Sequence, residues 1–316
     1  MVKPDTVLNK ILIITGATGV GKTELVLKLA AQTPSEVINA DIGQMYVPLT
    51  IGTAKPDWQN ESIPHHGFDI LDQPENFTVV QYRQFVAQKI QEIWARGKLP
   101  IIVGGSTFYI KALLFPPADL TRTTLNQPLN LGLNKIPNEQ LWDQLNQIDP
   151  QRASKLHPND YYRLRQACAI WQQTGLQPSQ FVPCYNPIAP YTLVILDRPK
   201  NNLYPRIDQR VLEMLQMGWV NEVQQLASPW QEFLQIKKII GYELILDYLA
   251  GKLNLMDCTS QIQKRVRNYA KRQQTFWRGL RQALQKADSE AQVLELDLTL
   301  SPLDLYINQL LNGLNR

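Results

Sequence analysis

The segment Gly16–Thr23, which reads GATGVGKT, has the residue types and the spacing of a phosphate-binding loop. It matches G-x-x-x-x-G-K-[ST], a pattern in which glycines let successive backbone amides point at phosphate oxygens. Lys22 adds a full positive charge, and the hydroxyl of Thr23 can bind Mg²⁺. The sequence therefore predicts a phosphate site, with Thr23 as a metal ligand, made of Gly16, Ala17, Thr18, Gly19, Val20, Gly21, Lys22 and Thr23.

Asp41 is a second residue whose side chain could take part in a reaction, because it directly follows a short apolar segment, VINA, which reads as a strand. Proteins that hydrolyse nucleotides usually carry an acid at the end of a strand beside the phosphate loop. The best such strand, 99–103, is followed by Gly104, Gly105 and Ser106 instead. Asp41 is thus the strand-end acid that could hold magnesium or accept a proton, and Gln44 could read a base edge. Two alternatives follow: the loop binds a diphosphate that is not a nucleotide, or it binds ATP for a kinase.

A strongly basic segment, residues 261–281, contains seven cationic residues and no acid. This segment carries a charge of +7 and the whole chain a net charge of +4, so the remainder of the chain carries −3. Aromatic residues are interleaved with the charges, as is typical of surfaces that bind a nucleic-acid backbone. The cationic residues are Lys264, Arg265, Arg267, Lys271, Arg272, Arg278 and Arg281. A second group, Tyr162, Arg163 and Arg165, lies elsewhere in the chain, and two separated groups favour a folded nucleic acid over a small ligand.

Hydrophobic periodicity predicts the elements that must position these residues. Apolar β-branched runs alternate with helical patterns, which indicates an α/β fold: a phosphate-loop parallel-sheet core covered by helices. Between 116 and 189 the pattern changes to short helices punctuated by proline and asparagine, and we expect a helical insertion there, which carries the second basic group. The core is then 1–115 with 190–316. We expect strands at 11–15, 36–40, 100–103 and 191–196, helices at 23–31, 77–96, 139–147 and 160–173, and only helices after 196.

Composition excludes several classes of protein. The 316 residues are 44% hydrophobic and 19% charged, so a large core is possible and wholesale disorder is excluded. Three cysteines without a C-x-x-C pair argue against a disulfide scaffold or a thiolate zinc site. His65 and His66 are adjacent and have no third ligand at a natural spacing, so we expect structural roles for them. The first apolar run is only five residues long, which predicts a cytoplasmic protein without a membrane segment.

Over nearly its whole length, the chain resembles the tRNA dimethylallyltransferase (isopentenyltransferase) family. Two strings, IGTAKP and AKRQ, are especially specific, because no common fold requires either. The family's serine after the strand-end aspartate is replaced by Ile42, and residues 116–150 match poorly. The matching motifs are Gly16–Thr23, Asp41 with Tyr46 and Ile51–Pro56, Pro64–Ile70, Val103–Tyr109, His157–Asp160 with Arg163, Asp197–Val211, Ile240–Tyr242 and Ala270–Phe276.

The resemblance implies transfer of a dimethylallyl group from its diphosphate to the exocyclic amine of adenosine 37 in tRNA. Asp41 would be the general base, with Thr18 and Arg206 as further catalytic residues and Mg²⁺ as the cofactor. The partners would be the anticodon stem-loop and dimethylallyl diphosphate, bound by a monomer. The tRNA-binding residues would be Asp41, Ile42, Gly43, Gln44, Ser106, Tyr162, Arg163, Arg165, Lys238, Arg267, Lys271 and Arg272. The alternatives are an ATP-dependent small-molecule kinase and a catalytically dead tRNA-binding protein.

Overall fold

The chain forms two compact units, which are described separately below. One unit consists of residues 1–111 and 187–316, and the other of residues 112–186. These divisions lie at 111/112 and 186/187, whereas the sequence analysis placed them at 115/116 and 189/190. The computed structural model describes residues 10–117, 133, 136–181, 183–287, 289 and 291–314. Much of the poorly matching segment, 118–132, therefore lies outside the described residues.

The first unit contains a six-stranded sheet in which every pair of neighbouring strands is parallel. The central strand, β1, is fully buried and pairs with β4 and β5 on its two sides. This confirms the α/β fold with a parallel sheet. In spatial order the strands are β3 (His65–His66), β2 (Ser35–Asn39), β4 (Leu99–Gly104), β1 (Ile11–Gly16), β5 (Tyr191–Asp197) and β6 (Gln292–Asp297).

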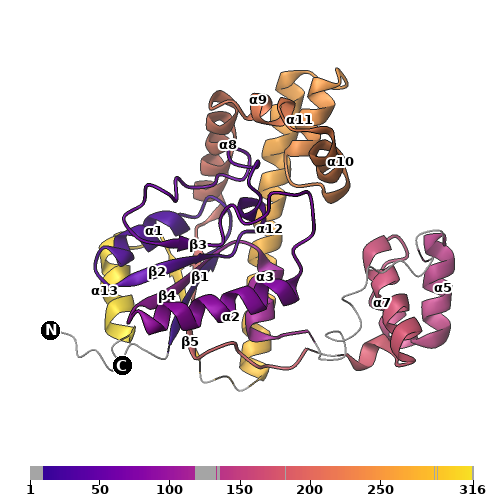
Figure 1. Ribbon diagram of the computed structural model, residues 1–316, viewed down its shortest axis with the longest axis horizontal. Helices are drawn as coiled ribbons and strands as arrows, with labels where there is room; N and C mark the ends of the chain where they lie inside the picture. Colours follow the sequence, from indigo (N-terminus) through magenta and orange to yellow (C-terminus); the bar gives the residue numbers. More distant parts are fainter. Residues whose placement is uncertain are drawn as a thin grey trace. The chain divides into compact units, whose positions relative to one another are not determined.

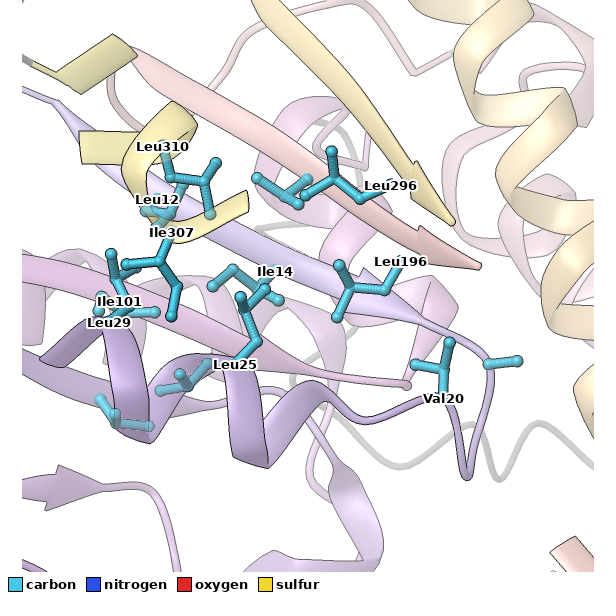
Figure 2. Close-up of a cluster of buried hydrophobic side chains, with 14 of the residues drawn as sticks. Leu12, Ile14, Val20, Leu25, Leu29, Ile101, Leu196, Leu296, Ile307 and Leu310 are labelled. Carbon is cyan, nitrogen blue, oxygen red and sulfur yellow. The ribbon is translucent and has the colours of Figure 1, made fainter. Parts of the chain in front are cut away.

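Helices cover both faces of this sheet, because a strand buried on both sides needs apolar partners on both. The helices α1 (Lys22–Ala30) and α13 (Leu303–Leu314) pack together on one face. Figure 2 shows their leucines and isoleucines against alternate side chains of β1, such as Leu12 and Ile14. The helix α2 (Val79–Ala95) packs on β2 and β4. Right-handed crossovers place α2 on the face opposite α1.

A layer of helices follows β5 and surrounds one half of a single long helix (Figure 1). The long helix, α12, has 32 residues and places the basic segment in regular helical structure. The surrounding helices are α8 (Lys200–Gln216), α9 (Trp219–Gln224), α10 (Ser228–Lys237) and α11 (Tyr242–Leu249), and the long helix α12 runs over Leu255–Lys286. A further helix, α3 (Thr107–Leu114), follows β4.

Among the described residues of the second unit, all the regular elements are helices. Its helices enclose their own apolar cluster, which includes Leu141, Leu145 and Leu164. The expected helices at 139–147 and 160–173 are confirmed within a residue or two of their predicted ends. The elements are α5 (Asn138–Ile148), α6 (Pro150–Ala153), α7 (Tyr161–Thr174) and η3 (Pro178–Gln180).

One expectation about the elements is wrong. The chain after residue 196 is not entirely helical, because Gln292–Asp297 forms β6 at the edge of the sheet. Its side chains are mostly exposed or half-buried, and Glu295 interrupts its apolar residues, so no continuous apolar run marks it. Among the described residues, no helix combines the length and the apolar composition that crossing a membrane requires.

Candidate active site

Parallel strands bring the predicted chemical residues to one edge of the sheet. The phosphate loop follows β1, Asp41 lies two residues after β2, Ser106 two residues after β4, and Arg198 directly after β5. The carboxyl ends of parallel strands meet at the same edge, where α/β proteins bind their ligands. The fold therefore collects four segments that are far apart in sequence into one candidate site.

The phosphate loop has the backbone conformation that its glycines predicted. Gly16, Gly19 and Gly21 all have positive φ angles, of 146°, 77° and 114°, which side chains rarely tolerate. The ammonium group of Lys22 donates to the carbonyl oxygens of Gly16 at 3.1 Å and Ala17 at 3.0 Å. The cation is thereby held directly over the loop, at the start of α1.

Asp41 is fixed by its neighbours as well as by the strand before it. It caps the short helix η1 (Ile42–Met45), and its Oδ1 accepts from the backbone N–H of Gly43 at 3.3 Å. The buried side chain of Asn39 accepts from Asp41 N at 2.9 Å and donates to Asp41 O at 3.0 Å. Asn39 is a positioning residue that the sequence analysis missed, and only its strand-end place next to the aspartate could have indicated it.

Lys22 and Asp41 line the same small cavity, of about 50 Å³, together with Thr23 and Asn39. Burial lowers the pKa of Lys22 to about 8, and the negative charge of Asp41 opposes that shift. Burial also raises the pKa of Asp41, and Lys22 and Arg210 counteract the rise. The carboxylate, the ammonium group and the guanidinium group therefore influence one another's charge within one desolvated environment.

Three arginines from the segment after β5 lie near the phosphate loop. Arg206, the predicted catalytic arginine, donates through Nε to Gly19 O at 3.2 Å, and Arg198 donates through Nε to Val20 O at 2.8 Å. Burial lowers the pKa of Arg210, and Asp41 opposes this shift. The sequence analysis named Arg198 and Arg210 only as parts of a motif. The structure places Arg210 in the electrostatic field of Asp41 and Lys22, which it does not show for Arg206.

Gln273, from the AKRQ string, joins the phosphate loop to the turn after β4. Its side chain is 1% exposed. Its Oε1 accepts from Thr18 N at 2.9 Å, and its Nε2 donates to Gly105 O at 2.8 Å. Thr18, a predicted catalytic residue, is thus tied to α12 through its backbone. In the sequence, Gln273 was only part of a family motif, and nothing near it indicated this structural role.

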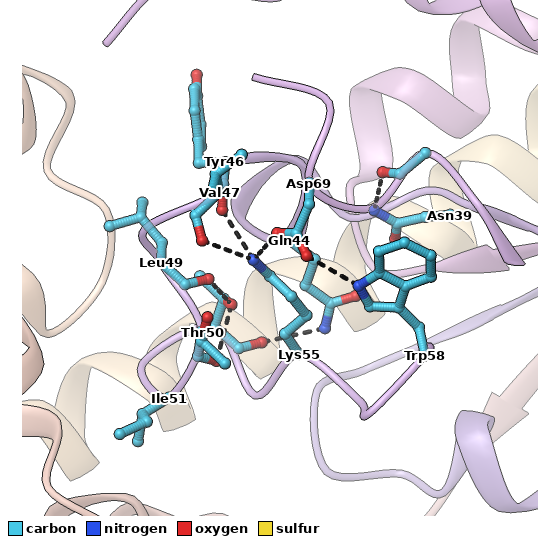
Figure 3. A network of polar contacts seen from close by, with 12 residues as sticks. Asn39, Gln44, Tyr46, Val47, Leu49, Thr50, Ile51, Lys55, Trp58 and Asp69 are labelled. Carbon is cyan, nitrogen blue, oxygen red and sulfur yellow. Dashed lines mark hydrogen bonds and ion pairs between the residues drawn. The ribbon is translucent and has the colours of Figure 1, made fainter. Parts of the chain in front are cut away.

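The IGTAKP string forms a loop that is held by side chains from the strand-end segments (Figure 3). Lys55 is almost fully buried and bonds the carbonyl oxygen of Tyr46 at 2.8 Å and the carboxylate of Asp69, which Trp58 also contacts. Gln44 donates to Thr53 O at 3.1 Å and to Ala54 O at 3.2 Å. The amide nitrogen of Gln44, the residue expected to read a base edge, is therefore occupied by this loop.

Ser106 lies beside the segment that carries Asp41, because its Oγ accepts from Ile42 N at 3.0 Å. Ile42 replaces a serine that the family carries at this position, so the sequence indicated that a hydroxyl next to Asp41 is lost. The structure supplies a hydroxyl at this backbone position from Ser106. Gly43, the next residue, is buried within η1, and its own N–H bonds Asp41 Oδ1.

The basic surface of α12 is partly neutralised by acids from other elements. Arg267 pairs with Asp208 of α8, Arg265 with Glu243 of α11 and Arg281 with Glu295 of β6. Arg267 is therefore committed to an internal ion pair. Among the described residues, no ion pair is formed by Lys264, Lys271, Arg272 and Arg278, so these four carry the available positive charge of the 261–281 segment.

The other predicted tRNA-binding residues lie on exposed surfaces. In the second unit, Tyr162 is 71% exposed, Arg163 pairs with Asp160 at 3.2 Å, and the guanidinium of Arg165 lies 3.5 Å from the ring centre of Tyr161. Stacked arginine and exposed tyrosine are suited to nucleic acids. Lys238 is exposed at the end of α10, in a left-handed backbone conformation.

His66 has structural partners, as expected, whereas His65, whose Nδ1 lies 2.8 Å from Ile63 O, also lines the cavity that Lys22 and Asp41 share. His66 and His65 form β3, and the Nε2 of His66 lies 2.7 Å from the buried carboxylate of Glu36. Arg96 and Lys98 bond the same carboxylate, and these partners lower the pKa of Glu36 to about 2 against the effect of its burial. This cluster lies near the start of β2, away from the strand ends that carry the site.

Comparison with known proteins identifies the family. Among curated relatives, the chain is 39% identical to tRNA dimethylallyltransferase 1 of Citrifermentans bemidjiense, over 85% of this chain and 89% of that protein. It is 35% identical to tRNA dimethylallyltransferase of Anoxybacillus flavithermus, over 85% and 88% of the two chains.

Solved structures agree with the sequence relatives. A tRNA isopentenylpyrophosphate transferase from Staphylococcus epidermidis matches 97% of this chain and 99% of its own, with a TM-score of 0.66 and 29% identity. A eukaryotic dimethylallyltransferase acting on tRNA matches 96% of this chain and 80% of its own, with a TM-score of 0.77 and 27% identity. The family model described as IPP transferase matches residues 44–280. The chain therefore belongs to the IPP transferase family.

Proposed function

We propose that the protein transfers a dimethylallyl group from dimethylallyl diphosphate to the exocyclic amine of adenosine 37 in tRNA. The observation that carries this proposal is the shared cavity of Lys22 and Asp41. It places a cation suited to a diphosphate leaving group and a carboxylate suited to a proton in one desolvated environment. The named relatives are tRNA dimethylallyltransferases, which gives no support to a kinase or to an inactive tRNA-binding protein.

The reaction breaks the bond between C1 of the allylic group and the diphosphate oxygen and forms a bond between the adenine nitrogen and C1. Negative charge accumulates on the leaving diphosphate, so the loop amides, Lys22, Arg206 and Arg210 stabilise the transition state. The nitrogen loses one proton, and Asp41 accepts it. Because the burial of Asp41 raises its pKa, the carboxylate is a stronger base than an exposed aspartate.

Magnesium fits this site as the cofactor. Thr23 is exposed at the first turn of α1, and within the described residues its hydroxyl has no hydrogen-bond partner. Magnesium is commonly held by one or two protein oxygens together with substrate phosphates, so Thr23 would hold it with Asp41 nearby. When bound, the ion supplies positive charge to the diphosphate.

The basic residues of α12 and of the second unit would bind the backbone of the anticodon stem-loop. The target base has to leave its stack to reach the cavity. We further propose that the protein acts as a monomer in the cytoplasm. Incubation of the protein with labelled dimethylallyl diphosphate and tRNA tests the activity directly. Label transferred to adenosine 37 supports it, and ATP-dependent phosphorylation of a small molecule, or tRNA binding without transfer, would contradict it.

A further inference from the structure

A half-buried acid outside the site holds three successive backbone amides of the IGTAKP loop and the residue before it. The carboxylate of Glu222, in α9, accepts from Thr50 N at 3.0 Å, Ile51 N at 2.6 Å and Gly52 N at 3.3 Å. The same carboxylate accepts from the hydroxyl of Tyr242 at 2.8 Å. Hydrogen bonds to an ionised acceptor are roughly twice as strong as neutral ones, so the three amide bonds hold the loop firmly, and the bond from Tyr242 ties the same carboxylate to α11.

The packing of Trp219 also holds the IGTAKP loop against α9. Trp219, in the first turn of α9, is 1% exposed and lies directly against two glycines. A Cβ on Gly52 would come within 2.0 Å of the indole nitrogen of Trp219, and a Cβ on Gly241 within 2.2 Å of its ring. Neither Gly52 of the IGTAKP string nor Gly241 of the Ile240–Tyr242 motif can therefore carry a side chain while Trp219 lies this close. Together they bring α9, α11 and the loop into one packed unit.

The loop is connected in turn to the segment that carries Asp41. Gln44, in η1, donates to the carbonyl oxygens of Thr53 and Ala54. A Cβ on Gly43 would lie 2.9 Å from the methyl group of Thr53, so the loop also packs against η1. Gly43 N bonds Asp41 Oδ1. An unbroken series of contacts thus runs from Glu222, through the loop and η1, to the carboxylate of Asp41.

We infer that Glu222 is a positioning residue that sets the place of Asp41 through the IGTAKP loop. This inference rests on the proposed function, because it assigns Asp41 to proton transfer. A carboxylate is needed at this position because all four bonds have donors on the other side. Glutamine would present an N–H group to one of these donors and leave it unpaired.

The test compares Glu222→Gln with Glu232→Gln, the same charge change at an exposed position of the neighbouring helix α10. Single-turnover transfer at saturating tRNA and dimethylallyl diphosphate should fall on the order of 10- to 100-fold in Glu222→Gln, as expected for a displaced catalytic group. Its affinity for dimethylallyl diphosphate should stay within about threefold of the parent, since Lys22 and its loop are untouched. Glu232→Gln should match the parent in both measurements.

Two further readouts separate positioning from general damage. Amide exchange should accelerate at residues 41–44 and 50–54 in Glu222→Gln, but not in the buried strand β1. Tyr242→Phe removes the hydroxyl's bonds to Glu222 and to the backbone of Gly52 but leaves the three amide bonds to the Glu222 carboxylate in place, so it should transfer at close to the parent rate. If Glu222→Gln does not fold, Glu222→Asp keeps the charge on a shorter side chain and should show the same loss of turnover.

The outcomes are distinguishable. If the parent transfers no dimethylallyl group to tRNA, the proposed function fails and the inference fails with it. If the parent is active and Glu222→Gln turns over within about threefold of it, the inference alone is wrong. A loss of diphosphate affinity equal to the loss of turnover would also overturn it, since damage would then extend to the whole site.

Discussion

The charge of Lys22 should control how tightly the protein binds dimethylallyl diphosphate as the pH changes. Its pKa is about 8, against 10.5 for an unburied lysine. The ammonium form binds the diphosphate and the neutral amine does not, so the affinity should fall as the pH rises through 8. Between pH 7.5 and 9 the protonated fraction falls about eightfold for such a pKa, and the dissociation constant should rise by about the same factor.

Isothermal titration calorimetry with dimethylallyl diphosphate, without tRNA and at constant ionic strength, measures this dependence. The terminal phosphate is already ionised over this range, so it adds little of its own. Lys22→Arg is the matched control, because a guanidinium group stays charged and the pH dependence should disappear. Asp41→Asn removes the negative charge that raises the pKa of Lys22, so the weakening should begin at a lower pH. An unchanged pH profile in Lys22→Arg would refute the assignment to Lys22.

Three further predictions concern the base, the basic helix and the buried glutamine. Asp41→Asn should lower single-turnover transfer by roughly 10²–10⁴-fold without loss of tRNA binding, and partial rescue by added magnesium would reassign Asp41 to the metal. Reversing Lys271 and Arg272 to glutamate should weaken tRNA binding and flatten its salt dependence by somewhat under one unit of slope per lost phosphate contact; filter binding across salt concentrations that shows an unchanged slope would contradict this. Gln273→Leu should destabilise the fold by about 1–3 kcal/mol, because two buried backbone groups lose their partner, and an unchanged midpoint of denaturant unfolding would argue against this.

The parts of the site that could be predicted from the sequence are local in the chain. The phosphate loop is a contiguous motif between a strand and a helix, and Asp41 directly follows a strand, so both were identified from neighbouring residues. Gln273 could not be assigned a role in this way, because its partners Thr18 and Gly105 are 255 and 168 residues away. The same holds for Arg267, whose partner Asp208 lies on another helix, 59 residues away.

The prediction of strands and helices was limited in the same way, because it depended on patterns among neighbouring residues. The buried strands were predicted because both of their faces are apolar, and long helices because their periodicity is clear. The edge strand β6 has one neighbour and mostly exposed side chains, so its sequence lacks that pattern. Asn39 and Glu222 were missed for a related reason, since the role of each polar side chain depends on the groups that surround it in the folded protein.

The place of β1 in the sheet affects how the enzyme can be made in the cell. Its two neighbours are β4, encoded before the helical unit, and β5, encoded after it. Strand β6, at the edge of the sheet, and helix α12, which bonds the phosphate loop, also follow the helical unit in the chain. During synthesis one edge of β1 therefore stays open until β5 has been made. The 112–186 unit has its own apolar cluster and can fold earlier, while the catalytic centre can assemble only once β5 and α12 have been made.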